Sequence, residues 1–184
     1  ALEYYKHSLE LKPEYSPVMS GLMLVHWKKG QMDKAIKYGE KAVLTDSADN
    51  STRTRFAKVL KTAGNKAVKN QDMQSGIEYY RRALNYQPRN KDILNNLAWW
   101  LATSENPELR DVDDALDLAE KAAKITDYED PVVLDTLAEA LSRKEKYEQA
   151  LKYAKKAREL GKEMENFNIA AVEKRISRLE EKID

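Results

Sequence analysis

The sequence predicts an all-α fold in which helix-turn-helix units stack into a solenoid. Three observations support this prediction. Small and apolar residues recur at helical spacing in successive segments of about 34 residues. Six Gly and five Pro among 184 residues leave too few turn residues for a strand-rich barrel or sandwich. No apolar run approaches the roughly 18 residues that a membrane-spanning helix needs, so we expect no membrane insertion.

The first unit of the chain, residues 1–15, matches only the second helix of such a repeat. Its small and aromatic residues stand 34 positions before those of the next unit: Ala1, Tyr5, Ser8 and Pro13 before Ala35, Gly39, Ala42 and Ser47. We therefore expect that the chain is cut from a longer protein, in which a first helix precedes it. Residues 16–49 then form the first complete unit.

Residues 50–90 form the clearest unit. Its periodic positions lie on both sides of a central turn: Leu60, Ala63, Gly64, Ala67, Gly76, Tyr80, Ala83 and Pro88. The stretch 50–56 precedes this pattern without Gly or Pro, and Asp49, Asn50 or Ser51 can cap a helix. The sequence therefore predicts one long first helix from about 50 to 70, with an overhang of about two turns.

The next two units are residues 91–129 and 130–162. The first of them carries a five-residue insertion between Ala98 and Ala115. The segment 102–114 therefore predicts a long loop, with a helix that starts near Asp111. Taken together, the units predict four first helices that begin near Ser16, Asn50, Lys91 and Pro131.

Residues 163–184 depart from the repeat pattern. Apolar residues continue among charged ones at helical spacing, at Phe167, Ala171 or Val172, Ile176 and Leu179. A helix with one apolar stripe can cap the end of a repeat array. The same stripe could alternatively pair two chains.

The repeated pattern resembles the tetratricopeptide repeat, a helix-turn-helix of about 34 residues. The resemblance covers about 160 of the 184 residues and implies a right-handed superhelix whose first helices line a concave face. Ser47 and Asp127 replace the family's Pro, and Gly39 and Ala119 replace its frequent aromatic residue. The segment 94–141 is also similar to the last repeats of many bacterial members, some of which follow a membrane glycosyltransferase-like module.

Enzyme motifs are missing from the sequence. Cysteine is absent, which removes a thiolate zinc site and a cysteine nucleophile and leaves the compartment undecided. One of the two histidines, His26, falls at a repeat position that is normally a buried aromatic, so we expect it in the core. We predict no catalytic site, no metal site and no cofactor.

The charge is distributed unevenly along the chain. Residues 1–90 hold 16 Lys and Arg against 9 Asp and Glu, whereas residues 91–184 hold 16 against 22. A basic run follows the predicted long helix: Arg53, Arg55, Lys58, Lys61, Lys66 and Lys69. The isoelectric point is only about 8.0, and aromatic residues do not alternate with the basic ones along this run, which contains only Phe56. We therefore expect no nucleic-acid binding, and charged residues that mainly solvate exposed helix faces.

The resemblance implies ligand contacts on the concave side of the first helices. Carried onto this chain, the candidate peptide-binding residues are Trp27, Lys28, Lys61, Asn65, Lys69, Asn95, Asn96, Trp99, Glu139 and Arg143. Trp99 offers the large contact area typical of binding hot spots. Lys61, Asn65 and Asn96 match part of the clamp with which some family members hold a peptide's terminal carboxylate. Val132 and Thr136 stand where that clamp has Lys and Arg.

The predicted function is a protein-protein interaction scaffold that binds a peptide or partner helix in the concave groove. Self-association is the alternative, because an uncapped repeat end is apolar and could form a homodimer. Leu2, Tyr5 and Leu9 would form that end. The C-terminal region of a bacterial membrane glycosyltransferase-like protein is a further alternative, implied by the resemblance alone.

Overall fold

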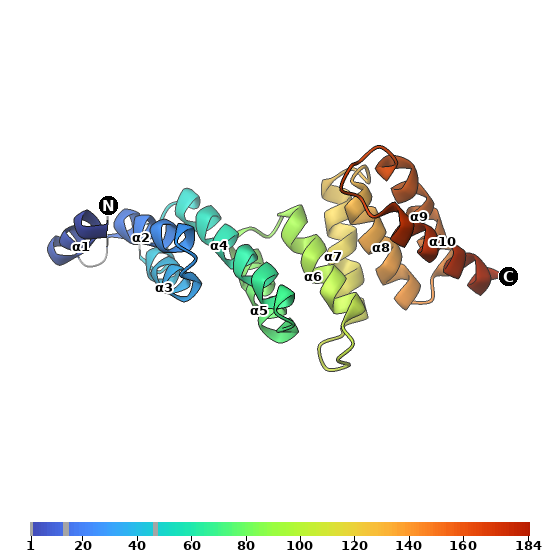
Figure 1. The fold of residues 1–184 in the computed structure, drawn as a ribbon, viewed down its shortest axis with the longest axis horizontal. Coiled ribbons are helices and arrows are strands. Elements are labelled where there is room, and N and C mark those ends of the chain that lie inside the picture. Colours follow the sequence, from blue (N-terminus) through green and yellow to red (C-terminus); the bar gives the residue numbers. More distant parts are fainter. Residues whose placement is uncertain (1, 13–14, 46–47) are drawn as a thin grey trace. The chain divides into compact units, whose positions relative to one another are not determined.

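The structure, a computed structural model, describes residues 2–12, 15–45 and 48–184, apart from the side chains of Leu2, Glu3, Lys6, Leu9 and Glu10. Throughout this described part the ordered elements are α-helices, as Figure 1 shows, which confirms the predicted all-α fold. The chain divides into two compact units, residues 1–88 and 89–184, here called the N-terminal unit and the C-terminal unit.

The N-terminal unit contains α1 to α5. Their bounds are Leu2–Leu11, Ser16–Lys28, Met32–Val43, Asn50–Lys69 and Met73–Tyr86. Helix α4 matches the long helix predicted over 50–70. Its N-terminus is capped by Asp49, whose Oδ1 accepts a hydrogen bond from the backbone N–H of Thr52 at 2.7 Å. Ser47 lies outside the described residues.

The core of the N-terminal unit shows how the chain compensates for a departure from the family pattern. Gly39 on α3 replaces an aromatic residue, and a Cβ at Gly39 would lie only 2.2 Å from the ring of Phe56. Phe56 on α4 is completely buried, so its ring fills this space. His26 is buried and stacks on Tyr38 with 5.3 Å between ring centroids, which confirms its expected place in the core.

Helix α1 packs on α2 through Tyr5. A Cβ at Gly21 would lie 2.6 Å from the Tyr5 ring, so this glycine lets the ring approach the α2 backbone. Tyr5 is therefore partly covered by the chain itself, whereas Leu2 and Leu9 lie outside the described side chains. Among the described side chains of α1, the exposed apolar ones are Tyr4 and Leu11.

The C-terminal unit contains α6 to α10. Their bounds are Lys91–Thr103, Val112–Ile125, Pro131–Arg143, Tyr147–Gly161 and Ile169–Ile183. Helices α6 and α8 are the first helices of two helix-turn-helix pairs, which α7 and α9 complete. The four predicted first helices, α2, α4, α6 and α8, begin at the residues expected from the sequence.

The predicted insertion forms a loop between α6 and α7. The loop is held at both ends, since Ser104 is buried and the N–H of Asp111 donates to the carbonyl of Leu101 at 3.1 Å. Asp111 also caps α7, because its Oδ1 accepts a hydrogen bond from the N–H of Asp114 at 3.0 Å. Both the loop and the helix start near Asp111 are thus confirmed.

Helix α10 covers the end of the C-terminal unit. Its apolar stripe, Val172, Ile176 and Leu179, is at most 5% exposed, and the helix packs on α9. The ring of Phe167 rests on Gly161, the last residue of α9. The stripe that could have paired two chains is therefore used within the chain, as expected of a capping helix.

Candidate functional site

The residues that could bind a partner in the C-terminal unit come from three helices. We call them the C-terminal groove: Trp99 on α6; Asp135, Glu139 and Arg143 on α8; and Lys174, Arg175 and Arg178 on α10. The sequence predicted Trp99 on α6 and Glu139 and Arg143 on α8 as candidate contacts. Those of α10 were not predicted.

Glu139 is the centre of this groove. Its side chain is only 4% exposed and accepts hydrogen bonds from three arginines. Oε1 accepts from Nε of Arg143 at 2.7 Å. Oε2 accepts from Nε of Arg175 at 2.9 Å and from Nη2 of Arg178 at 3.0 Å. A buried carboxylate with this many charged donors fixes the arginines in place.

The pKa values of the two carboxylates Glu139 and Asp135 are shifted in opposite directions. Burial alone would raise the pKa of Glu139, but the hydrogen bonds from Arg175 and Arg143 outweigh it and lower that pKa to about 2. Burial raises the pKa of Asp135, and the nearby Arg175 only partly offsets this effect. Glu139 therefore favours its ionised form more strongly than an ordinary glutamate does, and it holds three arginines.

Arg175 covers the aromatic residue that the sequence singled out. Its Cζ lies 5.6 Å from the centroid of the Trp99 ring, and its Nη1 donates to Oδ1 of Asp135. Arg175 is 8% exposed, and Trp99 is half-buried. One face of the predicted anchor is thus occupied by the chain's own guanidinium.

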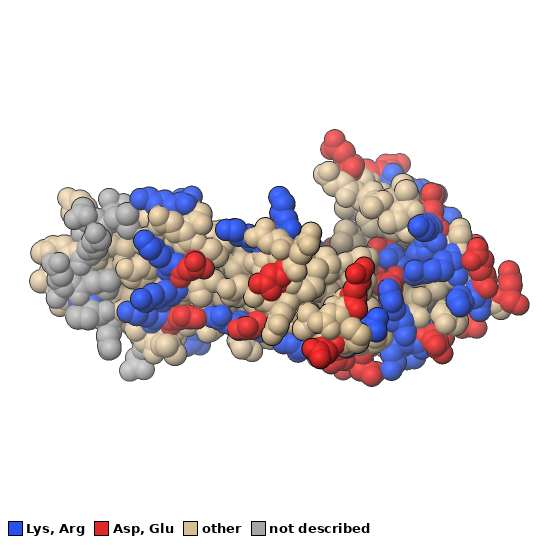
Figure 2. All heavy atoms as spheres, turned by 60° about the horizontal axis from the view of Figure 1, so that its bottom comes forward, with Lys and Arg blue, Asp and Glu red and all other residues tan. Residues whose placement is uncertain are grey.

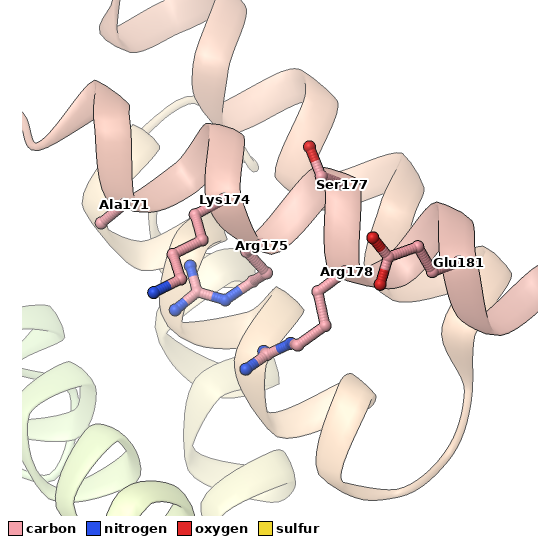
Figure 3. Close-up of a pocket in the computed structure, with 6 residues that line it drawn as sticks. All are labelled: Ala171, Lys174, Arg175, Ser177, Arg178 and Glu181. Atoms are coloured by element: carbon pink, nitrogen blue, oxygen red, sulfur yellow. The ribbon is translucent and has the colours of Figure 1, made fainter.

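The remaining cations of the groove are accessible. The side chains of Arg143 and Arg178 are 40% and 51% exposed, and Lys174 is exposed as well. Figure 3 shows Lys174, Arg175 and Arg178 projecting to the same side of α10. They line a pocket of about 380 Å³ together with Ala171, Ser177 and Glu181. An arginine has five N–H donors, so Arg143 and Arg178 can bind a further anion while they hold Glu139.

The two candidate asparagines of α6 differ in burial. Asn95 is 8% exposed, and its Oδ1 is buried without a hydrogen-bond partner among the described residues. Asn96 is half-buried. Asn95 therefore lies largely inside the unit, whereas Asn96 lies closer to its surface.

The other candidate residues lie in the N-terminal unit. Trp27 is half-buried on α2 and Lys28 is exposed; Lys61, Asn65 and Lys69 lie on α4. The hydroxyl of Tyr80 donates to Oδ1 of Asn65 at 2.6 Å, which occupies part of that amide. The residues of the partial clamp belong to different units, since Lys61 and Asn65 precede residue 88 and Asn96 follows it.

The arginines of α10 carried a sequence signal that the apolar pattern did not reveal. Asp135 and Glu139 stand four residues apart on α8 and face one side of the helix. Two carboxylates at this spacing in a packed helix need cations from a neighbouring element. Arg175 and Arg178, which stand three residues apart on α10, supply these cations.

Two other kinds of site are absent from the described residues. No group of three or more His, Cys, Asp or Glu side chains comes together there in a way that could hold a metal ion. None of the described helices is both long and apolar enough to cross a membrane.

Comparison with known proteins identifies the repeats. Residues 61–130 match the sequence profile of the family described as tetratricopeptide repeat. No curated protein gives a significant sequence match to the chain.

Several solved structures share the fold. The chain is similar to MamA, at 19% identity and a TM-score of 0.60, over 91% of this chain and 85% of that one. It is also similar to YrrB, described as having an unusual peptide-binding site, at 19% identity and a TM-score of 0.60, over 89% of this chain and 77% of that one. The first repeat domain of Spaghetti (RPAP3), bound to the HSP90 peptide SRMEEVD, is similar at 21% identity and a TM-score of 0.58, over 69% of this chain and 92% of that one.

Proposed function

We propose that this chain, a tetratricopeptide-repeat protein, is an interaction scaffold that holds an acidic segment of a partner protein in the C-terminal groove. The repeat fold is that of protein-protein interaction scaffolds. The groove combines residues of two first helices, α6 and α8, with residues of α10. In this chain, the ligand is an acidic segment, and the residues of the C-terminal groove contact it.

One observation carries this proposal: Glu139 anchors Arg143 and Arg178 from two different helices and leaves both accessible. Among the described residues of the groove and its pocket, four cations outnumber three carboxylates, which are Asp135, Glu139 and Glu181. A fixed pair of guanidinium groups binds a carboxylate at a lower entropic cost than two mobile ones. Lys174 adds a further cation at the adjacent pocket.

The comparisons support a peptide as the ligand. Two of the similar structures are described as peptide-bound or as having a peptide-binding site. In the present chain, Trp99 supports the floor of the groove through Arg175 and contributes apolar area at its edge. Asn96 and Arg143 complete the predicted contacts in this unit.

Site-specific photo-crosslinking tests the proposal. A photoreactive residue replaces Ser177 in the wall of the pocket, and in a second protein it replaces Gln149, an exposed residue of the second helix α9. We expect the Ser177 position to crosslink in native lysate to a protein segment rich in Asp and Glu. A synthetic peptide of that segment should then bind the unmodified chain.

The control for this experiment is the double variant Arg143→Gln and Arg178→Gln. Glu139 keeps Arg175 as its partner in this variant, so the fold should persist, which circular dichroism checks. We expect the peptide to bind at least about tenfold more weakly, as for the loss of two charged hydrogen bonds. Equal crosslinking at Gln149, a segment without carboxylates, or unchanged affinity would each contradict the proposal.

A further inference from the structure

Helix α4 carries charge of one sign over its whole length. Its 20 residues include no Asp or Glu and six basic residues: Arg53, Arg55, Lys58, Lys61, Lys66 and Lys69. It is also two turns longer than the repeat pattern requires, and Arg53 and Arg55 lie in this overhang. The proposed function does not involve this helix.

Four of these cations form a line along one face of α4, which we call the basic stripe: Arg55, Lys58, Lys66 and Lys69. The intervals between them are three, eight and three residues, so the second pair repeats the first after 11 residues, or three helical turns. All four side chains are exposed. At a rise of 1.5 Å per residue, the stripe is about 21 Å long.

The carboxylates of the chain leave the basic stripe largely uncompensated. Among the described residues, none of its four side chains forms a salt bridge, in contrast to the arginines around Glu139. Arg55 lies close enough to the capping Asp49 to help lower the pKa of that carboxyl. Lys58 lies over the Trp27 ring, with its Nζ 5.6 Å from the centroid. Both contacts leave the outer side of the stripe open to a ligand.

The charge of the whole N-terminal unit adds to this effect. Residues 1–88 contain 15 Lys and Arg and 9 Asp and Glu, a net charge of +6. On the face drawn in Figure 2, basic and acidic side chains lie interspersed, whereas α4 has basic residues only. A line of positive charges on one helix attracts a partner that carries negative charges at the same spacing.

The pattern fits an acidic helix better than a nucleic acid. A helix that lies along α4 has the same rise, so carboxylates spaced like the stripe meet all four cations at once. Single-stranded nucleic acid requires aromatic stacking platforms, and the one tryptophan beside the stripe already lies beneath Lys58. A duplex requires a broad basic surface, whereas these cations follow a single line.

We propose that the basic stripe of α4 is a second docking surface, which binds an acidic helical segment of a partner protein. This surface is independent of the C-terminal groove, because it lies in the other unit and shares no residue with it. Trp27 on α2 borders the stripe through its contact with Lys58 and would lie at the edge of the bound helix.

The test uses the full chain and a defined probe. The probe is a fluorescent, helix-forming peptide with Glu at four positions spaced by three, eight and three residues, and its affinity is measured by anisotropy. We expect measurable binding that weakens as salt is raised, because exposed charges are screened. The variant Lys58→Glu, Lys66→Glu, Lys69→Glu should bind at least about tenfold more weakly.

The matched control reverses three other lysines of the same unit. Lys34, Lys37 and Lys41 on α3 are exposed, so Lys34→Glu, Lys37→Glu, Lys41→Glu changes the net charge equally. We expect this control to reduce affinity by less than about threefold. The Arg143→Gln, Arg178→Gln variant should bind the probe like the unmodified chain, which keeps this test separate from that of the groove.

Three results would overturn the proposal. The first is no binding of the probe, or binding unchanged by the charge reversals on α4. The second is an equal loss for both triple variants, which would indicate attraction to net charge alone. The third is tighter binding of a single-stranded oligonucleotide of the same charge than of the peptide, which would make α4 a nucleic-acid surface. Circular dichroism of each variant checks that the helices remain.

Discussion

At the scale of single residues, Glu139 makes the most consequential contacts. Its carboxylate joins α8 to α10 through Arg175 and Arg178 and also holds Arg143 on its own helix. When a buried arginine loses its carboxylate partner, the free-energy cost of its desolvation is no longer offset by the ion pair. The same contacts that orient the groove therefore also stabilise the C-terminal unit.

We predict that Glu139→Gln lowers the free energy of unfolding at pH 7 by about 1.5–3 kcal/mol, the usual range for hydrogen bonds to charged groups. The folded-state pKa of Glu139, about 2, lies below its ordinary value of 4.5. Its contribution is therefore complete above pH 4.5 and is lost as the pH falls from 4.5 toward 2. Urea unfolding at pH 7 and pH 3 measures both effects.

The difference in stability between the two proteins should be smaller at pH 3 than at pH 7, with part of it remaining because pH 3 lies above the folded-state pKa of about 2. Asp135, whose pKa is raised by burial and in part by the charge of Glu139, contributes in the opposite direction, and this contribution becomes smaller in the variant. A stability difference of the same size at pH 7 and pH 3 would show that the ionised carboxylate is not the cause.

At the scale of elements, three of the four turns between paired helices share one backbone feature, a residue with positive φ. Gly30, Gln71 and Glu145 each follow a first helix and have φ angles of 72°, 66° and 58°. Only glycine adopts this left-handed region without steric cost. The chain uses glycine in the first of these turns and larger residues in the other two.

We therefore predict that Glu145→Gly raises the free energy of unfolding by up to about 1 kcal/mol. Relief of the left-handed conformation, about 1–2 kcal/mol, exceeds the entropy that glycine loses on folding, about 0.5–1 kcal/mol. Chemical denaturation of the two proteins measures the change. Gly30→Ala is the reciprocal variant and should be destabilised, and a gain in stability there would refute this explanation.

Removal of α10 tests the capping helix as an element. A chain that ends after residue 162 exposes the side of α9 that Ile176 and Leu179 cover and leaves Glu139 without Arg175. We expect faster amide exchange in α8 and α9 and unchanged exchange in α2 to α4, since these helices belong to the other unit. Hydrogen-exchange mass spectrometry measures both, and faster exchange throughout the chain would contradict the expectation.

The starts of several helices could be predicted from the sequence. The starts of α4, α6 and α8 follow from local signals, because Asp49, Asn90 and Asp130 each accept hydrogen bonds from the first turn of their helix. The insertion before Asp111 was likewise visible as a break in spacing. Such signals depend on neighbouring residues, so they can be read without the fold.

The chemistry of the groove could be predicted only in part. Small and apolar spacing predicted α6 and α8, and the resemblance to the repeat family then implied Trp99 and Arg143 as candidate contacts. The meeting of Arg175 with Glu139 joins residues 36 positions apart, and charged side chains on a helix have no periodic requirement that identifies a partner. The same limitation hid the hydrogen bond from Tyr80 to Asn65.

At the scale of the whole molecule, the chain divides into two compact units near residue 88. Each unit has its own core, with Phe56 and Leu60 buried in one and Leu134 and Leu137 in the other. Stability in repeat proteins is close to a sum over neighbouring repeats, so each unit can respond separately to a mutation or ligand. The groove and the basic stripe fall in different units.

We predict that residues 89–184 fold on their own. This unit contains two complete helix pairs and the capping helix, and Lys91 links α6 to α8 through Asp130 at 2.8 Å. The isolated segment should be helical by circular dichroism and should unfold in one cooperative transition. A gradual, non-cooperative melt would show that its core depends on residues 1–88.

The loop between α6 and α7 has a consequence for protein engineering. Its two bases are closed by Ser104 and by the Asp111 to Leu101 hydrogen bond, while residues 105–108 are exposed. Because the entropy of closing a loop grows slowly with its length, added residues cost little once the bases are fixed. A fluorescent reporter or affinity tag can therefore be inserted after Glu105, so the loop provides an attachment point for sensors.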